Sequence, residues 1–353
     1  MATDSQPGAV ADSKAAAATG NTKAPWPRWK KLTLVGVALV VVIGLAVGLG
    51  VGLTRNKGGD DGDSDNSQSD NSGSDNDDAS LAANNTSLWK PKVGASWQII
   101  LKYPIALGSN DTTSDLEPDV DIWDLDLYEN DASTFSALRD AGKHVICYFS
   151  AGSWEDWRDD AGDFDKKDLG KGLDGWAGEK WLNISSPSVR NIMRKRIKLA
   201  SDKGCHAIDP DNVDGYANKN GLDLTSADSI SYMKFLSDEA AKYNMSTGLK
   251  NAGGIISSVL SYVHFSVNEQ CIQYGECDTF SPFIDDNKPV FNIEYPDDAP
   301  KVKDSEKKVI CNTEGDASGS KGFSKVIKKM NLDGWVEYCG DTQTYTTDTN
   351  QGS

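Results

Sequence analysis

The sequence predicts an α/β protein: a (β/α)8 TIM-type barrel preceded by a transmembrane helix and a disordered linker. Residues 88–353 are numerous enough to form one large core of the size typical of such barrels. In this region, short apolar runs alternate with segments whose apolar residues have helical spacing, a pattern typical of parallel sheets. Many of the apolar runs end in polar or aromatic residues, and strand ends in this fold meet on one face.

The amino-terminal part predicts a membrane anchor. Residues 1–31 are rich in Ala, Ser, Thr and Pro and are expected to form a disordered cytoplasmic tail. Leu32 to Leu53 carries no charge and is long enough, at about 1.5 Å per residue, to cross a bilayer. A cleaved signal peptide is the competing interpretation, but its apolar core would be shorter and nearer the start.

The charges around Leu32–Leu53 predict its orientation. More Lys and Arg residues precede this segment than follow it closely, so the amino terminus should be cytoplasmic. The protein would then be a single-pass type II protein of the cell membrane, with its folded domain extracellular. Gly44, Gly48 and Gly52 recur at every fourth position, which could allow two spans to pair as a dimer.

Residues 54–87 form an acidic linker of Ser, Asn, Asp and Gly without apolar periodicity, so we expect a spacer rather than a fold. The whole chain has a formal net charge of -17 at pH 7. This charge argues against nucleic acid as a partner and favours a cationic or neutral ligand.

The barrel domain, residues 88–353, contains eight candidate strands. They are Ser96–Leu101, Asp121–Leu127, His144–Ser150, His206–Asn212, Ser246–Asn251, Phe265–Gln270, Val290–Tyr295 and Gly334–Tyr338. Apolar residues at helical spacing predict helices between several of them, at Ser133–Ala141, Ser188–Lys203 and Ser226–Tyr243. Lys308–Cys311 could be a ninth strand; we interpret it as an accessory segment leading to a helix at Gly322–Met330.

Carboxylates gather at the predicted strand ends, most densely in Gly204–Tyr216, where an apolar run leads into Asp209, Asp211 and Asp214. Pro210 favours extended geometry before it and removes a backbone donor. A solvated acidic turn is the simpler interpretation of this segment alone. Acidic ends on five or more strands, with tryptophans in adjoining loops (Trp154, Trp157 and Trp176), instead suggest a carbohydrate cleft.

The predicted extracellular location permits disulfides. Cys271 and Cys277 could close a small ring, Cys311 and Cys339 could tie down the last strand, and Cys147 and Cys205 would be either a pair or free core thiols. Asn-x-Ser/Thr glycosylation sequons begin at Asn84, Asn85, Asn110, Asn183 and Asn244.

Other chemistries have little support in the sequence. His144, His206 and His264 are the only histidines, and each begins a predicted strand, so no histidine-rich metal set is expected. No Gly-x-Ser-x-Gly or Gly-x-x-x-x-Gly-Lys motif occurs. We therefore predict no metal and no cofactor.

Four motifs in one order resemble glycoside hydrolase family 114: Trp181–Arg190, Gly204–Tyr216, Val267–Cys277 and Phe291–Tyr295. The similarity covers nearly all of residues 96–339. It implies a (β/α)8 barrel that cuts α-1,4-linked galactosamine polymers such as galactosaminogalactan, either cationic or partly N-acetylated. The membrane span and acidic linker also look like those of fungal members of this family.

The resemblance places the catalytic pair at Asp211 and Glu269, with Glu294 as the reserve carboxylate. Glycosidic cleavage needs one carboxyl to protonate the leaving oxygen and another to attack or to activate water. We expect Asp211 to be the nucleophile and Glu269 the acid/base of a retaining reaction. The candidate substrate-binding residues are Asp124, Asp126, Tyr148, Trp154, Asp209, Asn212, Asp214, Lys250, Asn251, Glu294 and Glu337.

Two other functions remain open at this point. The domain could be a barrel hydrolase that acts on neutral α-galactosides, or a cell-surface lectin that keeps the cleft without turnover. The presence of both Asp211 and Glu269 argues against the lectin, and the overall acidity argues mildly against a neutral substrate.

Overall fold

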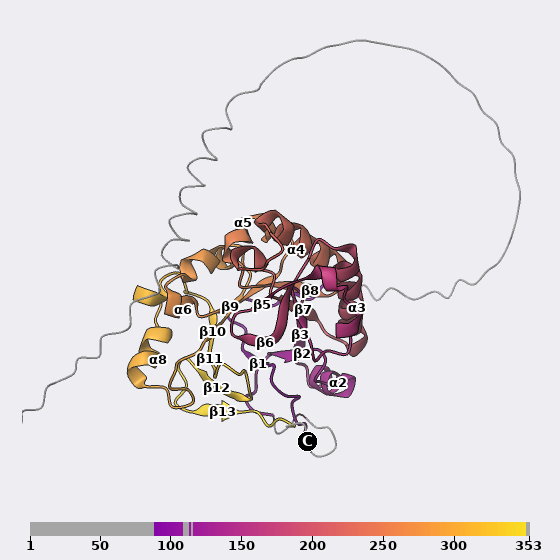
Figure 1. Ribbon diagram of the computed structural model, residues 1–353. Coiled ribbons are helices and arrows are strands. Elements are labelled where there is room, and N and C mark those ends of the chain that lie inside the picture. The colour runs from indigo at the N-terminus through magenta and orange to yellow at the C-terminus, as the bar shows by residue number, and fades with distance from the viewer. Residues whose placement is uncertain (1–87, 109–112, 114–115, 351–353) are drawn as a thin grey trace, which may run out of the picture. The chain divides into compact units, whose positions relative to one another are not determined.

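The computed structural model describes residues 88–108, 113 and 116–350 (Figure 1). The predicted tail, membrane span and linker, together with Asn84, Asn85 and Asn110, lie outside these residues and stay predictions. In the part that is described, no helix is both long and apolar enough to cross a membrane.

One curled sheet of ten strands organises the domain. In sheet order the strands are β1 (Trp97–Ile100), β2 (Ile122–Asp126), β3 (His144–Ser150), β7 (Ala207–Asp211), β8 (Ser246–Lys250), β9 (Phe265–Glu269), β10 (Val290–Glu294), β11 (Ser324–Ile327), β12 (Trp335–Tyr338) and β13 (Thr344–Thr346). Strands β1 to β11 of this sheet are parallel. Strands β12 and β13 are added antiparallel. The result is a TIM-like α/β fold.

The carboxyl-terminal part of the prediction was wrong in two places. The eighth parallel strand is β11, in the segment predicted as the helix Gly322–Met330. Gly334–Tyr338 was expected to be that parallel strand but supplies the antiparallel β12. Lys308–Cys311, which we interpreted as an accessory segment rather than a ninth strand, falls at the end of helix α8. Short apolar runs flanked by lysines do not distinguish strand from helix by periodicity alone.

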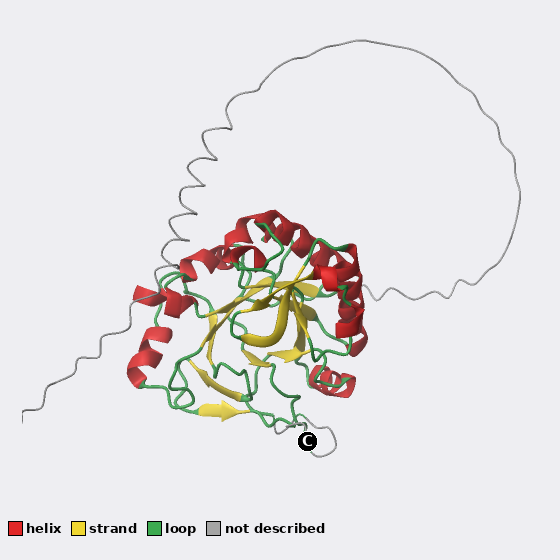
Figure 2. Cartoon of the chain, viewed as in Figure 1, coloured by secondary structure: helices red, strands yellow, loops and turns green. Residues whose placement is uncertain are grey.

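Helices cover the outside of the curled sheet. They are α2 (Ala132–Asp140), α3 (Pro187–Lys203), α4 (Ser226–Ala241), α5 (Ile256–Val259), α6 (Cys271–Tyr274), α7 (Ser281–Asp285) and α8 (Asp304–Ile310). Figure 2 shows them as an arc around the strands, while the side between α8 and α2 is lined by β12, β13 and loops. Short 3-10 turns lie at 161–163, 166–168, 215–217, 253–255, 277–280 and 315–317.

The longest helices show why these segments fold as they do. Helix α3 starts at Pro187, whose fixed φ suits a first turn, and ends before Gly204, which adopts the left-handed conformation at φ 89°. Its buried side, which includes Ile192 and Ile197, packs in the core between helices and sheet. Helix α4 starts with a capping box in which Thr225 and Asp228 satisfy each other's backbone N–H groups.

A small second sheet follows β3 and was not predicted. It consists of β4 (Ser153–Glu155), β5 (Leu169–Leu173) and β6 (Trp176–Leu182), antiparallel in the order β4-β6-β5. We call residues 151–182 the insert. In Figure 1, β5 and β6 are drawn in front of the curled sheet.

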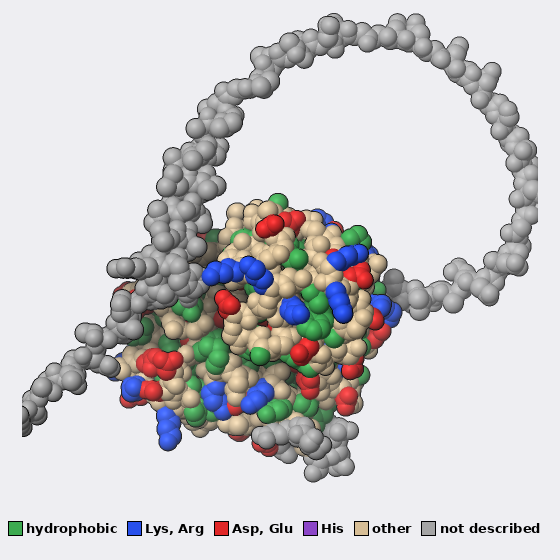
Figure 3. Space-filling model, in the orientation of Figure 1, with side chains coloured by type: hydrophobic (Ala, Val, Ile, Leu, Met, Phe, Trp, Pro, Cys, Tyr) green, Lys and Arg blue, Asp and Glu red, His purple; other side chains and the backbone are tan. Residues whose placement is uncertain are grey.

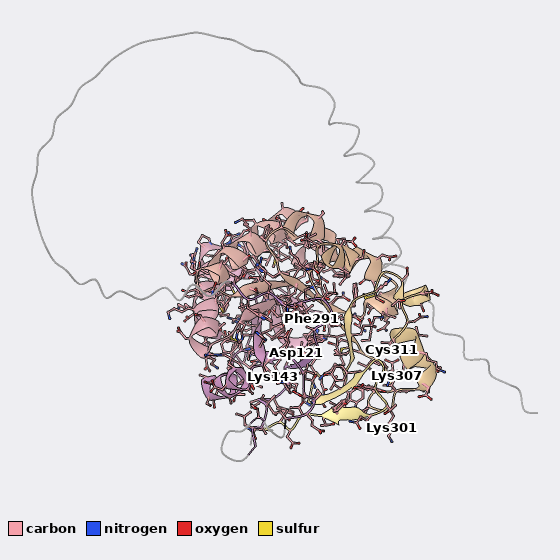
Figure 4. The ribbon with its side chains drawn as sticks, turned by 180° about the vertical axis from the view of Figure 1, so that it is seen from behind. Asp121, Lys143, Phe291, Lys301, Lys307 and Cys311 are labelled. Carbon is pink, nitrogen blue, oxygen red and sulfur yellow. A yellow bond between two sulfur atoms is a disulfide. The ribbon has the colours of Figure 1, made fainter. Side chains whose placement is uncertain are left out.

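Strand alternation places polar residues above an apolar floor inside the curled sheet. Ala207, Asp209 and Asp211 of β7 face the same side because successive side chains alternate. Ala207 belongs to an apolar cluster that includes Phe265 and Phe291, whose rings lie 5.8 Å apart. Phe291 is labelled near the middle of the view from behind (Figure 4). The carboxylates therefore stand on a close-packed base.

A buried hydrogen-bond network joins the first strand to the end of the sheet. Gln98 of β1 donates to the carbonyl of Gly334 at 3.2 Å and accepts from Lys328 Nζ at 2.9 Å. Lys328 also donates to the carbonyl of Asp333 at 2.7 Å. Burial lowers the pKa of Lys328 well below its usual value, and its amine donates both of these hydrogen bonds.

All six cysteines form disulfides. The bridges Cys271–Cys277 and Cys311–Cys339 confirm the two predicted pairs, and Cys147–Cys205 settles the third pair as bridged. Cys147 lies on β3, and Cys205 precedes the neighbouring strand β7, which explains how two buried strand positions meet.

We predict that Lys328→Met destabilises the domain, because Gln98 Oε1 and the Asp333 carbonyl lose a buried donor. The expected loss is about 1 to 3 kcal/mol in the free energy of unfolding, measured by denaturant titration at neutral pH. Lys329→Met is the matched control, since Lys329 pairs with Asp333 nearer the surface and such pairs contribute about 0 to 1 kcal/mol. Equal losses in the two variants would contradict the role of Lys328.

Candidate active site

Three neighbouring strands end with the same backbone geometry. The last residues of β7, β8 and β9 are Asp211, Lys250 and Glu269. The next residue in each case has a positive φ: 60° at Asn212, 49° at Asn251 and 62° at Gln270. Residues other than glycine rarely adopt this backbone conformation, and those that do cluster at functional sites. The chain turns sharply at all three points and leaves the charged side chains at the end of the sheet interior.

Lys250 is the centre of this group. Its ammonium Nζ lies 3.7 Å from Asp211 Oδ2, 3.7 Å from Glu269 Oε2 and 3.8 Å from Asp209 Oδ2. Burial alone would lower the pKa of Lys250, but the surrounding carboxylates raise it above its usual value. Lys250 therefore carries a positive charge although it is almost fully buried, at 2% exposure.

Asp211 is held on both its side chain and its backbone. Its Oδ2 accepts from the Tyr148 hydroxyl at 2.9 Å. Its carbonyl accepts from the N–H groups of Ala151 and Gly152 at 2.9 and 3.0 Å. A Cβ atom at Gly152 would lie 1.8 Å from the Asn212 carbonyl oxygen, so this close approach requires glycine. The start of the insert thus fixes the end of β7.

Glu269 is surrounded by donors. The Tyr295 hydroxyl donates to Oε1 at 2.5 Å, and Asn251 Nδ2 donates to Oε2 at 2.9 Å. Burial by itself would raise the pKa of Glu269, but Lys250 and these two hydrogen bonds outweigh it and leave the pKa below its usual value. Glu269 is therefore ionised in the free protein at neutral pH.

Asp211 and Glu269 open onto a cleft of about 600 Å³. Its walls include five of the predicted substrate-binding residues at the strand ends: Tyr148, Asn212, Asp214, Lys250 and Asn251. The insert contributes Trp157 and Trp176, which are 52% and 55% exposed. The loop between β11 and β12 contributes Met330, 52% exposed. Broad apolar faces beside carboxylates are suited to sugar rings. In Figure 3, acidic, basic and apolar side chains are interspersed over the visible face, so charge does not form one patch there.

Arg158 anchors the insert to the sheet. Its two terminal nitrogens donate to the carboxylate oxygens of Asp126 on β2 at 3.1 and 2.7 Å, and its Nε donates to Glu155 at 3.0 Å. Asp126 and Glu155 are 2% and 4% exposed. Asp126 lines the cleft as predicted, but its carboxylate is already engaged by this bidentate pair.

Two carboxyls in the cleft have raised pKa values. Burial, reinforced by Asp211, raises the pKa of Asp214 to about 6. Burial, followed by repulsion from Glu155 and Asp211, raises the pKa of Glu179 to about 7, although the Ser153 hydroxyl bonds to it at 2.7 Å. Glu179 was not among the predicted site residues because it belongs to the unpredicted insert. Apolar and polar residues do not alternate in Trp176–Leu182, so periodicity provides no strand signal there.

Five predicted substrate-binding residues do not line the cleft. Asp124 and Asp209 are completely buried below Asp211. Glu294 accepts the N–H groups that begin helix α6, at 2.9 and 3.2 Å. Glu337 lies on the antiparallel β12 and pairs with Lys307 of α8 at 2.7 Å (Lys307 is labelled in Figure 4). The indole N–H of Trp154 donates to the carbonyl of Ala161, and Lys180 Nζ lies over the Trp154 ring, 5.4 Å from its centre.

The sequons that can be placed are Asn183, which is partly buried, and Asn244, which is exposed. Asn183 donates to Asp168 at 3.3 Å. Glycosylation at either position stays a prediction.

We predict that Arg158→Gln loosens the insert, because the buried Asp126 loses its cation and Glu155 keeps only Arg196, at 3.9 Å. Breaking a buried pair in this way costs about 3 to 5 kcal/mol, which denaturant unfolding can measure. Limited proteolysis should also cut residues 151–182 faster than the rest of the domain.

The compensated control is Arg158→Gln with Asp126→Asn and Glu155→Gln, in which no charge is stranded. This variant should recover most of the lost stability. An Arg158→Gln protein as stable and as protease-resistant as the wild type would contradict the anchoring role.

Two solved structures are similar to this chain. The crystal structure of Aspergillus fumigatus Ega3 in complex with galactosamine is 53% identical, with a TM-score of 0.66, and the match covers 72% of this chain and 98% of that one. The glycoside hydrolase domain of PelA from Pseudomonas aeruginosa is 12% identical, with a TM-score of 0.48, over 67% of this chain and 95% of that one. No curated protein gave a significant sequence match.

The sequence profile of glycoside-hydrolase family GH114 matches residues 78–344, which include every strand of the curled sheet except part of the last. Its range contains the Lys250-linked carboxylates, the insert and the three sharp turns. The chain therefore belongs to glycoside-hydrolase family GH114 and is a glycoside hydrolase.

Proposed function

We propose that this glycoside hydrolase cleaves α-1,4-linked galactosamine polymers within the chain, using Asp211 and Glu269. The observation that carries the proposal is the pair of carboxylates on one ammonium, Lys250 Nζ, at the base of a cleft of about 600 Å³. The complex that Ega3 forms with galactosamine supports the choice of sugar.

Retaining cleavage is the reaction we propose for this pair. Asp211 would attack the anomeric carbon while Glu269 protonates the departing oxygen; water would then attack the glycosyl–Asp211 ester and give its proton to Glu269. Asp211 Oδ2 and Glu269 Oε2 each lie 3.7 Å from Lys250 Nζ, so their separation cannot exceed twice that distance. A retaining pair needs about 5 to 5.5 Å, which fits within this limit.

One observation favours the opposite order of roles. The hydrogen bonds from Tyr295 and Asn251 and the charge of Lys250 hold the pKa of Glu269 below its usual value, whereas a general acid must begin protonated. In that assignment Glu269 would attack the anomeric carbon and Asp211 would supply the proton.

Cationic sugars suit the rest of the cleft. Asp214 and Glu179 have pKa values of about 6 and 7 because burial and neighbouring carboxylates oppose their ionisation. An ammonium group of the substrate placed beside Asp214 or Glu179 would favour the ionised form of that carboxyl, and the resulting carboxylate would bind the ammonium. Trp157 and Trp176 offer exposed ring faces for stacking on sugars. Partly N-acetylated chains would place their apolar acetyl groups against the same walls.

We further propose that the enzyme acts at the cell surface, anchored by Leu32–Leu53 with the hydrolase domain outside. The uncharged segment, the preceding basic residues and the acidic linker support this arrangement. Three disulfides in the domain are consistent with an oxidising compartment.

For catalysis, Asp211→Asn and Glu269→Gln keep side-chain shape but remove the proton and charge chemistry. Each should lower kcat on galactosamine polymer by a factor of about a hundred or more, with folding and polymer binding largely kept. Reducing-end release from polymers with and without N-acetyl groups, and from neutral α-galactosides, is the measurement. Near wild-type cleavage by either variant would remove that residue from the mechanism, and preferential cleavage of neutral galactosides would overturn the substrate.

Azide added to the alanine variants tests which of the two residues is the nucleophile and which is the acid/base. Azide should replace the missing nucleophile in Asp211→Ala and give a glycosyl azide of inverted configuration; in Glu269→Ala it should give a product of retained configuration. The reverse pattern would assign the nucleophile to Glu269.

For the anchor, protease added to intact cells should release a soluble, active domain by cutting within residues 54–87. The released fragment would be measured by immunoblot and by its activity in the medium. A variant lacking residues 1–53 and carrying a cleavable secretion signal is the control, because its domain should appear in the medium without protease. A domain that stays protected on intact cells would refute the proposed orientation.

A further inference from the structure

We propose that Asp124 and Asp209, below the catalytic pair, share one proton, and that this proton leaves the Lys250 ammonium available to Asp211 and Glu269. This inference rests on the proposed function for its kinetic consequence, but the shared proton itself can be observed without any substrate. Asp124 and Asp209 are positioning residues here, because neither lines the cleft.

The hydrogen bonding of the two aspartates supports a shared proton. Both side chains are completely buried, and none of their four carboxyl oxygens receives a hydrogen bond from an N–H or O–H group of the described residues. Two ionised carboxylates can only accept, so side by side they would repel each other and stay unsatisfied. A proton on one lets it donate to the other, and the two groups are placed for that bond.

Asp168 shows how this chain satisfies a buried carboxylate that has ordinary donors. It is 2% exposed, and its oxygens accept from the Ser186 hydroxyl at 2.7 Å and from Asn183 Nδ2 at 3.3 Å. Asp124 and Asp209 have no equivalent donors among the described residues, although the same protein provides them elsewhere.

The charge within the sheet interior also supports a shared proton. Four carboxyls approach one another there, Asp124 from β2, Asp209 and Asp211 from β7, and Glu269 from β9, and the cation facing them is Lys250 from β8. The flanking Tyr148 and Tyr295 stay neutral, because burial and then the adjacent carboxylates raise their pKa values well above the usual range. Full ionisation of all four carboxyls would leave a large uncompensated buried charge, and one retained proton reduces it.

The pKa directions agree with this geometry. Burial raises the pKa of Asp209 to about 7, with Lys250 opposing the shift and Asp211 and Glu269 adding to it. Burial, and then repulsion by Asp209, raises the pKa of Asp124 well above its usual value.

The consequence concerns Lys250, whose ammonium is nearly equidistant from Asp209, Asp211 and Glu269. When the pair keeps its proton, Asp209 is a weak competitor for the ammonium. When the proton leaves at higher pH, the full charge on Asp209 attracts Lys250 away from the catalytic carboxylates, and turnover should fall. The pair would therefore contribute to the alkaline limit of kcat.

Infrared difference spectroscopy of the complete protein without substrate tests the shared proton directly. Besides the absorption of Glu179 and Asp214, which also have raised pKa values, the wild type should show at neutral pH a protonated carboxyl band that is absent from both Asp124→Asn and Asp209→Asn, because the amide then donates the bond. Asp168→Asn is the matched control and should keep the band. A wild-type spectrum without such a band, or a band that neither variant removes, would overturn the proposal, whatever the enzyme's substrate.

The pH profile of kcat tests the consequence. In Asp209→Asn the competing charge beside Lys250 cannot form, so the alkaline fall of kcat should move to higher pH, while Asp168→Asn should follow the wild-type profile apart from any loss of stability. An unchanged alkaline limb in Asp209→Asn would remove the link to Lys250. If Asp209→Asn does not fold, Asp124→Asn, whose Asp209 stays charged and whose kcat should be lowered across the profile, and the pH titration of the wild-type infrared band decide the case. If the infrared band is present but the enzyme does not cleave galactosamine polymer, the proposed function is refuted and the shared proton is not.

Discussion

The Lys250 ammonium is the interaction on which the rest of the site depends. A buried charge is tolerated only when it is paired, and here one cation faces three carboxylates at 3.7 to 3.8 Å. Without it, Asp211 and Glu269 would repel each other inside a poorly hydrated sheet interior. With it, the carboxylate that attacks can be ionised while both side chains point into the same cleft.

The fold supplies this arrangement through strand alternation and through what surrounds the strand ends. Every second residue of β7 faces inward, so an apolar floor at Ala207 leads upward to Asp209 and then to Asp211. The insert completes the site from outside: its backbone binds the Asp211 carbonyl, and Arg158 ties it to β2. Its tryptophans then form one wall of the cleft.

The sequence was informative where local pattern and structure coincide. Apolar runs located the first seven parallel strands, and the acidic ends of β7 and β9 identified Asp211 and Glu269 as cleft residues. The same signal failed at Glu294. It also ends a predicted strand with a carboxylate, but this carboxylate accepts a backbone N–H at the start of α6. It failed at Glu337 because pairing direction depends on partners distant in the chain. Glu179 was missed because a short hairpin sheet resembles a loop until its strands pair.

The central claim is that the charge of Lys250 keeps the attacking carboxylate of the proposed catalytic pair ionised, and the pH dependence of kcat/KM for Lys250→Met tests it most directly. Removing a cation at this distance should raise the pKa of the attacking carboxyl, so the acidic limb of the profile should move upward by about one pH unit or more. The fall in kcat should be far larger than any change in polymer binding. An acidic limb at the wild-type position, with turnover retained, would contradict the account.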